Sequence, residues 1–325
     1  MNKKPNLFIV FSPLQIINAI EAIHHFKCKN NILLINYKPR QDKNNAQMDD
    51  LVGYHKWDEI IKVGSGGRRS KFLIYVKLIK RLKKVQYDHV FVAGFTSAIY
   101  TIVANLKKNK LFFMDDGVGT ITAYHDIFAP NVKIKLRLKH MRFWLFGIRT
   151  KFTDKINIFT YFDLQPLPHV AVIPNKLRWF SKNYTANLTR DKRVYFLGHP
   201  HDDKPEIYLK TVECFLKKQN FEVVYIPHRF EKINKSLRAM FEKNSVKVEI
   251  INMPVEMYFL INKIMPNVVV GFYTSAFFVM LLLYPTVSYQ SVVSLSYDSP
   301  AVKDIYKRLA SKGVEILNYK GEINA

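Results

Sequence analysis

Two adjacent aspartates, followed by a glycine, stand directly after a short apolar run. The run covers residues 111–114, and the three residues are Asp115, Asp116 and Gly117. Neighbouring carboxylates repel each other, so the pKa of one should rise toward the value that suits a general base. A glycine lets the loop approach a ligand closely. The same tripeptide occurs in solvated turns, and its place after an apolar run is what favours a catalytic loop.

Residue types that bind phosphate follow another apolar run. Residues 223–226 are followed by Pro227, His228 and Arg229. A guanidinium suits a phosphate leaving group, and a histidine can also protonate one. A histidine whose bonds are satisfied within its loop is the alternative interpretation.

Two hydroxyl residues, Thr274 and Ser275, stand where the apolar run 268–273 meets an apolar helical segment. Hydroxyls and backbone N–H groups at the start of a helix bind phosphate oxygens. Ordinary helix capping is the alternative role for this pair.

Polar residues also follow three further apolar runs. Gln15 follows the first run of the chain, and Glu256 follows the run 246–252. The loop 198–203 holds two histidines and two aspartates, which could converge on a metal. We expect a solvated or substrate-facing loop instead, and no metal site. Three residues of this loop enter the candidate site: Gly198, His201 and Asp202.

The elements that position these residues are short strands alternating with helices. Continuous apolar strands in this alternation are typical of an α/β fold with parallel sheets covered on both faces. Ligands bind beyond the carboxyl ends of such strands, which is where the candidate residues stand. Strands are expected at 6–12, 31–37, 59–63, 89–94, 110–117, 193–200, 221–229, 246–252, 267–275, 285–292 and 314–319.

The alternation stops in the middle of the chain and then restarts. Residues 120–152 are expected to be mainly helical, 163–175 are Pro-rich, and 181–192 are polar without a clear period. We place a linker in the last of these segments. The sequence therefore predicts two Rossmann-like domains, 1–185 and 190–325, whose parallel sheets face a central cleft.

Composition excludes several classes of protein. The 325 residues include 24 Phe and 18 Tyr, too many aromatics for a disordered chain. Two cysteines cannot build a disulfide scaffold or a Cys-rich zinc site. The sequence lacks a dinucleotide fingerprint, a P-loop, a nucleophile elbow and a DxD motif. It shows no secretory signal and no apolar stretch of membrane-spanning length, so we expect a cytoplasmic protein.

The charge of the chain favours an anionic partner. Lys and Arg number 50 against 26 Asp and Glu, a formal net charge of +24. The segments 68–84 and 133–151 interleave basic with large apolar residues, as segments lying on an anionic membrane do. Each could instead be a surface helix whose apolar stripe packs on the core. Trp144, close to Arg142 and Arg149, favours the membrane for the second segment.

Taken together, the motifs resemble those of bacterial sialyltransferases. These enzymes carry an acidic-acidic-Gly motif, a His-Pro motif and a Ser/Thr pair in the order found here. The sequence is most similar to the lipooligosaccharide sialyltransferases of glycosyltransferase family 52, which are related to the capsular polysialyltransferases. The segments that carry the resemblance are FSPLQ (11–15), FMDDGVG (113–119), FLGHP (196–200), PHR (227–229), EMY (256–258) and FYTSAFFVM (272–280).

Two positions depart from the pattern of that family. Arg229 stands where the family has a proline, and the only His-Pro of this sequence is His199-Pro200. The aspartate that some members carry after the strand 193–200 aligns with His201, and Asp202 lies one residue further on. The resemblance leaves the base open between the Asp-Asp-Gly motif and Asp202.

The resemblance implies a GT-B fold and an inverting, metal-independent transfer of sialic acid from CMP-sialic acid. The acceptor would be a bacterial surface glycan, lipooligosaccharide or capsule, bound by the first domain, and the second domain would bind the CMP-sugar. No cofactor is implied besides the donor. The enzyme would sit on the inner face of the plasma membrane, and a homodimer is compatible with the family.

The resemblance also implies roles for individual residues. Asp116 or Asp115 would be the base, with Asp202 as the alternative, and His228 would be the acid or the cation beside the phosphate. The donor-binding residues would be Thr274, Ser275, Glu256, Gly198, Arg229 and Pro227. The residues lining the cleft on the acceptor side would be Gln15, Gly117 and His201.

Two alternatives stay open at this point. A transferase for another CMP-nonulosonate, such as pseudaminic or legionaminic acid, would need the same phosphate-binding groups. A basic nucleic-acid-binding protein would use the positive charge and the aromatic residues. The sequence contains no recognised RNA- or DNA-binding motif, and the acidic loop disfavours contact with a phosphate backbone.

Overall fold

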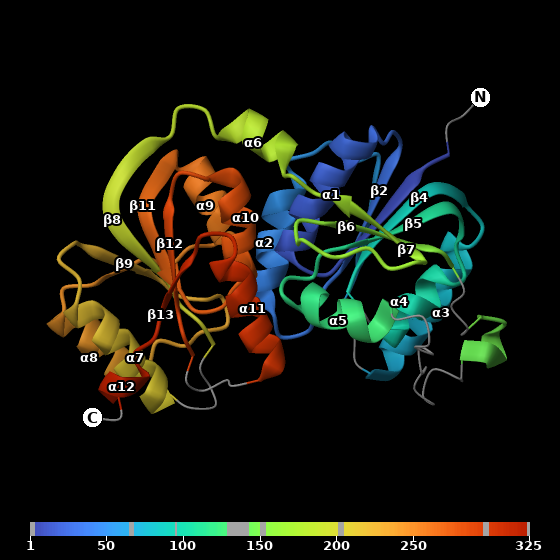
Figure 1. Ribbon diagram of the computed structural model, residues 1–325. Coiled ribbons are helices and arrows are strands. Elements are labelled where there is room, and N and C mark those ends of the chain that lie inside the picture. The colour runs from blue at the N-terminus through green and yellow to red at the C-terminus, as the bar shows by residue number, and fades with distance from the viewer. Residues whose placement is uncertain are drawn as a thin grey trace. The chain divides into compact units, whose positions relative to one another are not determined.

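The computed structural model describes residues 4–64, 68–94, 96–128, 143–149, 154–200, 205–294 and 299–323. The chain divides into two compact units, unit 1 (Met1–Trp179) and unit 2 (Phe180–Ala325). Each unit is built on one parallel β-sheet with helices packed against it (Figure 1).

Unit 1 has, in the part of the chain that is described, seven strands in the order β3-β2-β1-β4-β5-β6-β7. The strands are β1 Asn6–Val10, β2 Asn31–Asn36, β3 Glu59–Val63, β4 Gln86–Ala93, β5 Lys107–Met114, β6 Ile156–Thr160 and β7 Val170–Pro174. The helices are α1 Pro13–Phe26, α2 Asp42–Val52, α3 Arg68–Leu82, α4 Ser97–Val103, α5 Gly119–Phe128 and α6 Arg178–Tyr184, the last of which spans the boundary between the units. Helices α1 and α2 cover one face of the sheet, and α3, α4 and α5 cover the other (Figure 1).

Unit 2 has six strands over its described residues, in the order β10-β9-β8-β11-β12-β13. The strands are β8 Thr189–Leu197, β9 Val223–Ile226, β10 Lys247–Val248, β11 Ile264–Gly271, β12 Ser288–Val292 and β13 Glu315–Leu317. The helices are α7 Pro205–Lys217, α8 Lys235–Lys243, α9 Val255–Ile261, α10 Ser275–Leu283, α11 Pro300–Ala310 and α12 Lys320–Ile323.

Both sheets follow the doubly wound order in which the first strand of the unit pairs with the second on one side and the fourth on the other. In unit 1 these central neighbours are β1 and β4, and in unit 2 they are β8 and β11. The strand order reverses at these positions, which makes their carboxyl ends the expected place for a ligand.

Stacked aromatic rings fix the register of the central strands of unit 1. Phe8 of β1, Phe91 of β4 and Phe112 of β5 are register partners, and their ring centroids lie 4.6 and 4.8 Å apart. These rings are buried, so a slip of one residue would turn them to the opposite face. The packing therefore determines where β1, β4 and β5 end, and with them the residues that follow.

Several elements of the fold were not predicted from the sequence. Helix α2 was not predicted because it has only two buried apolar residues, Met48 and Leu51, and so shows no clear helical period. Strand β7 lies at the edge of the sheet with one fully buried residue, Val170, so it lacks a continuous apolar run. The expected linker 181–192 contains the end of α6 and the start of β8. Of the segment 120–152, the part in α5 is helical, and residues 129–142 lie outside the described ranges.

Candidate active site

The two aspartates of the acidic motif have different surroundings. Asp115, at the carboxyl end of β5, is 0 % exposed. Its Oδ1 accepts a hydrogen bond of 2.7 Å from Thr160 Oγ1, and its Oδ2 accepts one of 2.8 Å from the Tyr161 N–H. Both donors lie at the carboxyl end of β6, so Asp115 ties the ends of two neighbouring strands together.

The pKa of Asp115 is raised to about 7, mainly by burial and to a smaller extent by the negative charge of Asp116. Hydrogen bonds from Thr160, Tyr161 and Thr120 oppose this rise. The expected rise of one pKa in the pair is confirmed, but burial causes more of it than repulsion does. The carboxyl of Asp115 has no exposed surface and is bonded to the end of β6, a position in which it shapes the loop.

Asp116 is exposed, and its carboxylate is held in place. Its Oδ1 accepts a hydrogen bond of 2.5 Å from Gln15 Nε2, and its N–H donates one of 2.8 Å to Thr120 Oγ1. The Gln15 oxygen accepts a bond of 2.6 Å from the Phe11 N–H, which turns Nε2 toward the carboxylate. Gly117 follows with φ 64°, a left-handed conformation that favours glycine.

Two asparagines beneath this loop were missed from the sequence. Asn18 Nδ2 donates to the carbonyl of Asp115 at 3.4 Å, and Asn175 Nδ2 donates to Asn18 Oδ1 at 3.1 Å. Both side chains are buried. A signal for Asn18 existed, because it lies three residues after Gln15 on the same face of a helix that is apolar in its first half. A buried amide at such a position needs partners.

In unit 2, His228 follows β9 and is half-buried. Its Nδ1 accepts a hydrogen bond of 3.2 Å from the Phe230 N–H, so the neutral ring carries its proton on Nε2. Burial, together with the positive charges of Arg229 and His199, lowers the pKa of His228 to about 3. At neutral pH and without ligand, this pKa favours the neutral ring of His228, with Nε2–H as a hydrogen-bond donor.

Glu256 lies in the first turn of α9 and is buried. Burial raises the pKa of its carboxyl, and the positive charge of Arg229 acts in the opposite direction. Because Arg229 acts on both His228 and Glu256, these three residues form one cluster at the carboxyl edge of the sheet of unit 2.

Thr274 caps α10, and Ser275 is the first residue of this nine-residue helix. The Thr274 Oγ1 accepts a hydrogen bond of 3.2 Å from the Ala276 N–H, and such a hydroxyl can donate a second bond. The capping role is confirmed, and it is compatible with binding an anion at the same helix start. The pair follows β11, which is next to β8 at the reversal of strand order.

Gly198 follows β8 and makes room for a residue that the sequence did not suggest. A Cβ at position 198 would lie 2.0 Å from Glu231 Oε2 and 2.7 Å from the Tyr225 hydroxyl. The carboxylate of Glu231 accepts hydrogen bonds from the hydroxyls of Tyr208 and Tyr225 and from the His228 N–H. An acidic residue three positions after His228 was the only local signal for it.

Three candidates from the sequence remain, and one of them lies in the described residues. Pro227 is half-buried and joins β9 to His228. His201 and Asp202 lie outside the described residues. In the ranges that the structure describes, no group of three or more His, Cys, Asp or Glu side chains could hold a metal ion.

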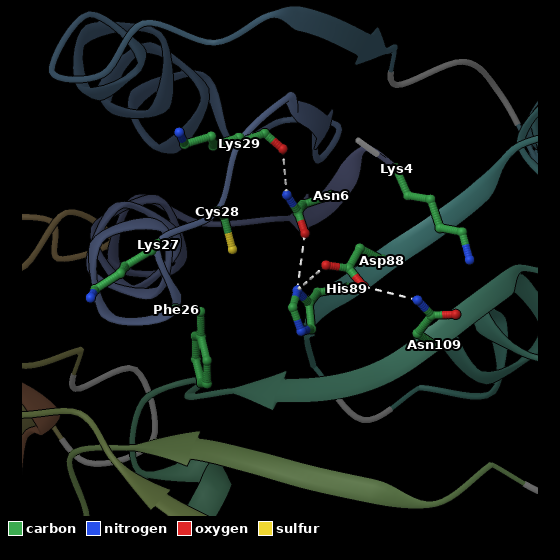
Figure 2. A pocket seen from close by; sticks show the side chains of 9 residues that line it. All are labelled: Lys4, Asn6, Phe26, Lys27, Cys28, Lys29, Asp88, His89 and Asn109. Atoms are coloured by element: carbon green, nitrogen blue, oxygen red, sulfur yellow. Dashed lines mark hydrogen bonds and ion pairs between the residues drawn. The ribbon is translucent and has the colours of Figure 1, made fainter. Parts of the chain in front are cut away.

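A pocket of about 410 Å³ lies toward the opposite edge of the unit 1 sheet (Figure 2). Within it, Asn6 Nδ2 donates a hydrogen bond of 2.7 Å to the Lys29 carbonyl, and Asn6 Oδ1 lies 3.1 Å from His89 Nδ1. The same His89 nitrogen lies 3.4 Å from Asp88 Oδ2. Asn109 Nδ2 donates a hydrogen bond of 2.9 Å to Asp88 Oδ1 (Figure 2). These residues lie in the first halves of β1, β4 and β5 or at the end of α1, so the pocket is separate from Asp116 and Gln15.

Solved structures show which fold the chain shares. The α/β-galactoside α-2,3-sialyltransferase of Photobacterium phosphoreum superposes with a TM-score of 0.56 at 12% identity, over 97% of this chain and 99% of that chain. UDP-GlcNAc 2-epimerase from Neisseria meningitidis gives a TM-score of 0.53 at 12% identity, over 98% and 88% of the chains. The spinosyn forosaminyltransferase SpnP gives 0.52 at 12% identity, over 98% and 86%. The expected GT-B fold, with two parallel α/β units, is confirmed.

Sequence comparison identifies the family. No curated protein sequence matches the chain significantly. The family model described as alpha-2,8-polysialyltransferase matches residues 6–176, which include both aspartates and Gln15. The expected relation to sialyltransferases and polysialyltransferases is confirmed. The chain belongs to the alpha-2,8-polysialyltransferase family and is a sialyltransferase-like glycosyltransferase.

Proposed function

We propose that this enzyme transfers sialic acid from CMP-sialic acid to a bacterial surface glycan, lipooligosaccharide or capsule, with inversion and without a divalent metal. Membership of the polysialyltransferase family supports sialic acid as the transferred sugar. The observation that carries the proposal is the exposed carboxylate of Asp116, held at 2.5 Å by Gln15 Nε2 beside the buried Asp115.

Asp116 is the general base in this proposal. An acceptor hydroxyl gives its proton to the Asp116 carboxylate while its oxygen forms a bond to the anomeric carbon of sialic acid. Gln15 engages Oδ1, so Oδ2 is the oxygen that we assign to the hydroxyl. The orientation of the carboxylate is set before the acceptor arrives, which lowers the cost of reaching the transition state.

The leaving group in this proposal is CMP. The bond between the anomeric carbon and the phosphate oxygen breaks, and its electron pair stays on the phosphate. Arg229 supplies positive charge, and the Nε2–H of His228 donates a hydrogen bond. The hydroxyls of Thr274 and Ser275, with the N–H groups of α10, bind the remaining phosphate oxygens. Glu256 is assigned to the ribose or the cytosine.

The same groups support metal independence in this proposal. A guanidinium and several hydrogen-bond donors supply the charge stabilisation that a divalent ion supplies where a DxD motif binds it, and the sequence has no such motif. A CMP-nonulosonate other than sialic acid would use the same phosphate-binding residues and is the second candidate donor.

A basic and apolar surface of unit 1 supports work on a lipid-linked acceptor. This surface, the α3 surface, consists of α3 and residues 143–149. The ring of Phe72 on α3 packs against Phe143 and Phe146 at centroid distances of 4.7 and 5.5 Å. The two basic segments noted in the sequence are thus in contact, while Val76 and Ile79 of α3 are buried in the core.

The exposed part of the α3 surface combines apolar and cationic side chains. Trp144 is 75% exposed and Leu145 is 76% exposed. Lys80 Nζ lies 5.8 Å from the centroid of the Phe146 ring, and Arg149 is exposed. An indole beside basic residues is typical of the interface of an anionic membrane. We propose that this surface docks on the inner face of the plasma membrane.

No helix in the described part of the chain is long and apolar enough to cross a bilayer.

The test of the proposed donor is thermal stability of the whole chain with CMP, CDP, UDP or GDP in EDTA. A ligand that binds only the folded state raises the melting temperature. We expect CMP to raise it selectively and without metal, and Asp116→Ala to keep this effect while abolishing transfer. His228→Ala should weaken the CMP effect. A preference for UDP or GDP, or a requirement for metal, would contradict the proposal.

A further inference from the structure

Glu231 places a buried carboxylate among three hydrogen-bond donors. The side chain is 9% exposed. Its Oε1 accepts bonds of 2.5 Å from the Tyr225 hydroxyl and 3.2 Å from the Tyr208 hydroxyl, and its Oε2 accepts one of 3.0 Å from the His228 N–H. A buried carboxylate with this many donors is held firmly, because each lost bond would leave a buried polar group unpaired.

The two phenols around Glu231 stay protonated. Burial raises the pKa of Tyr208 and Tyr225 well above the usual value, and the charge of Glu231 raises both further. The hydroxyls of the two tyrosines lie 2.5 Å apart, and the Tyr208 oxygen accepts a bond of 3.2 Å from the His199 N–H. The network thus joins the end of β8, α7, β9 and the loop after β9.

The network closes around His228 itself. The Glu231 side chain accepts a hydrogen bond from the His228 N–H, and the Glu231 N–H donates one of 2.8 Å to the His228 carbonyl. The N–H of Phe230, which lies between these two residues in the chain, donates a hydrogen bond of 3.2 Å to His228 Nδ1. The backbone of His228 is fixed on both sides, and its ring is fixed through Nδ1, so Nε2 is the ring atom left for a ligand.

The Glu231 carboxylate packs directly against the backbone of Gly198. Any side chain at that position would overlap Oε2 of Glu231, with a Cβ only 2.0 Å away. The end of β8 and the loop after β9 therefore approach each other as closely as the carboxylate allows. The Gly198 N–H donates a hydrogen bond of 2.8 Å to the Ile226 carbonyl, and this bond holds the ends of β8 and β9 together.

We propose that Glu231 is a positioning residue, which holds the loop after β9 so that the His228 Nε2–H faces the phosphate of the donor. The inference rests on the proposed function, in which His228 binds that phosphate. Glu231 itself contacts no substrate in this scheme and transfers no proton, and it acts only through the backbone and ring of His228.

A double-mutant cycle with Glu231→Gln and His228→Ala tests this inference. Gln keeps the shape but offers one acceptor oxygen in place of two, so one facing donor loses its partner. We expect kcat with CMP-sialic acid to fall about 10- to 100-fold in Glu231→Gln, the loss associated with a misplaced reacting group. In the His228→Ala background the same change should cause no further fall. Glu242→Gln, on the exposed side of α8, is the matched control and should leave kcat unchanged.

A second measurement reads the position of His228 without substrate. In ¹⁵N-histidine-labelled protein the ring signals of His228, assigned by their loss in His228→Ala, should show one Nε2–H tautomer. Glu231→Gln should give a mixture of tautomers, and Glu242→Gln should not. If Glu231→Gln does not fold, Tyr225→Phe replaces it, since it removes one hydroxyl and keeps the ring that stacks on Phe196 at 5.5 Å.

The outcomes separate the two proposals. An equal loss of kcat from Glu231→Gln with and without His228, or an unchanged His228 tautomer, would overturn the positioning role. Wild-type protein that neither binds CMP nor consumes CMP-sialic acid would overturn the proposed function instead. In that case the tautomer measurement still decides whether Glu231 orients His228.

Discussion

Gln15 and Asp116 are joined by a hydrogen bond of 2.5 Å, although 101 residues of sequence separate them. Gln15 follows β1 and Asp116 follows β5, and the stacked rings of Phe8, Phe91 and Phe112 set the register of the strands that carry them. The orientation of the proposed base therefore depends on aromatic packing in the middle of the sheet. This dependence links the core of unit 1 directly to its chemistry.

Replacing the Gln15 amide should impair chemistry more than donor binding. Gln15→Met keeps a similar length but cannot donate to Asp116, so the carboxylate loses its fixed orientation. We expect kcat for transfer to fall about 10- to 100-fold with little change in the KM for CMP-sialic acid. Gln86→Met, at an exposed position of β4, is the control. A rise in KM at unchanged kcat would show that Gln15 binds donor instead.

The buried carboxyl of Asp115 should make stability depend on pH. Its pKa in the folded chain, about 7, lies above the 3.8 of a free aspartate, so folding favours the protonated form. Its contribution to the free energy of unfolding is present below about pH 4 and is lost as the pH rises through about 7. Asp115→Asn cannot ionise and should lack this loss.

Urea denaturation measures the difference directly. The free energy of unfolding of the wild type minus that of Asp115→Asn should decrease between about pH 4 and about pH 7. Asp50→Asn, exposed on α2, is the matched control. A difference that increases with pH would mean that the hydrogen bonds to Asp115 outweigh its burial.

A methyl group at position 198 should disturb stability and donor binding together. Gly198→Ala puts a Cβ where Glu231 Oε2 now lies, so the carboxylate and the His228 loop must move. Overpacking of this kind costs about 1–3 kcal/mol. We expect a lower melting temperature and a smaller CMP-induced rise, both measured by differential scanning calorimetry. Gly321→Ala meets nothing within 4 Å and should behave like the wild type.

Removing the apolar tip of the α3 surface should weaken membrane binding. We expect the double variant Trp144→Ala with Leu145→Ala to bind vesicles containing phosphatidylglycerol about tenfold less tightly, since two side chains no longer enter the interface. Phe221→Ala removes a side chain that is 61% exposed in unit 2 and serves as the control. Co-sedimentation that shows no preference of the wild type for anionic over neutral vesicles would contradict the docking proposal.

The strands were predictable where both faces of the sheet are covered. All five residues of β1 are buried, and the last four of β5 and of β8 are buried as well, so each leaves a continuous apolar run in the sequence. Strand β7 lies at an edge and gives no such run. Most candidate residues follow buried strands, so the rule for carboxyl ends found them, whereas Glu256 follows the short and exposed β10.

The supporting residues could not be found in the same way. Asn175 reaches Asn18 across 157 residues, and Glu231 reaches Tyr208 across 23, so no local pattern marks either pair. The sequence also could not separate the roles of Asp115 and Asp116. Their distinction depends on Thr160 and Tyr161 at the end of β6, a strand that the sequence did not reveal.

The division of the chain at Trp179 and Phe180 has a consequence for biosynthesis. Each unit is one continuous stretch of sequence with its own sheet. The whole of unit 1, with every partner of Asp115 and Asp116 named above, is synthesised before the first strand of unit 2. Domains fold as units while the ribosome is still working, the N-terminal one first. The acidic loop can therefore reach its final form on the nascent chain, before His228, Arg229 or Glu256 has been made.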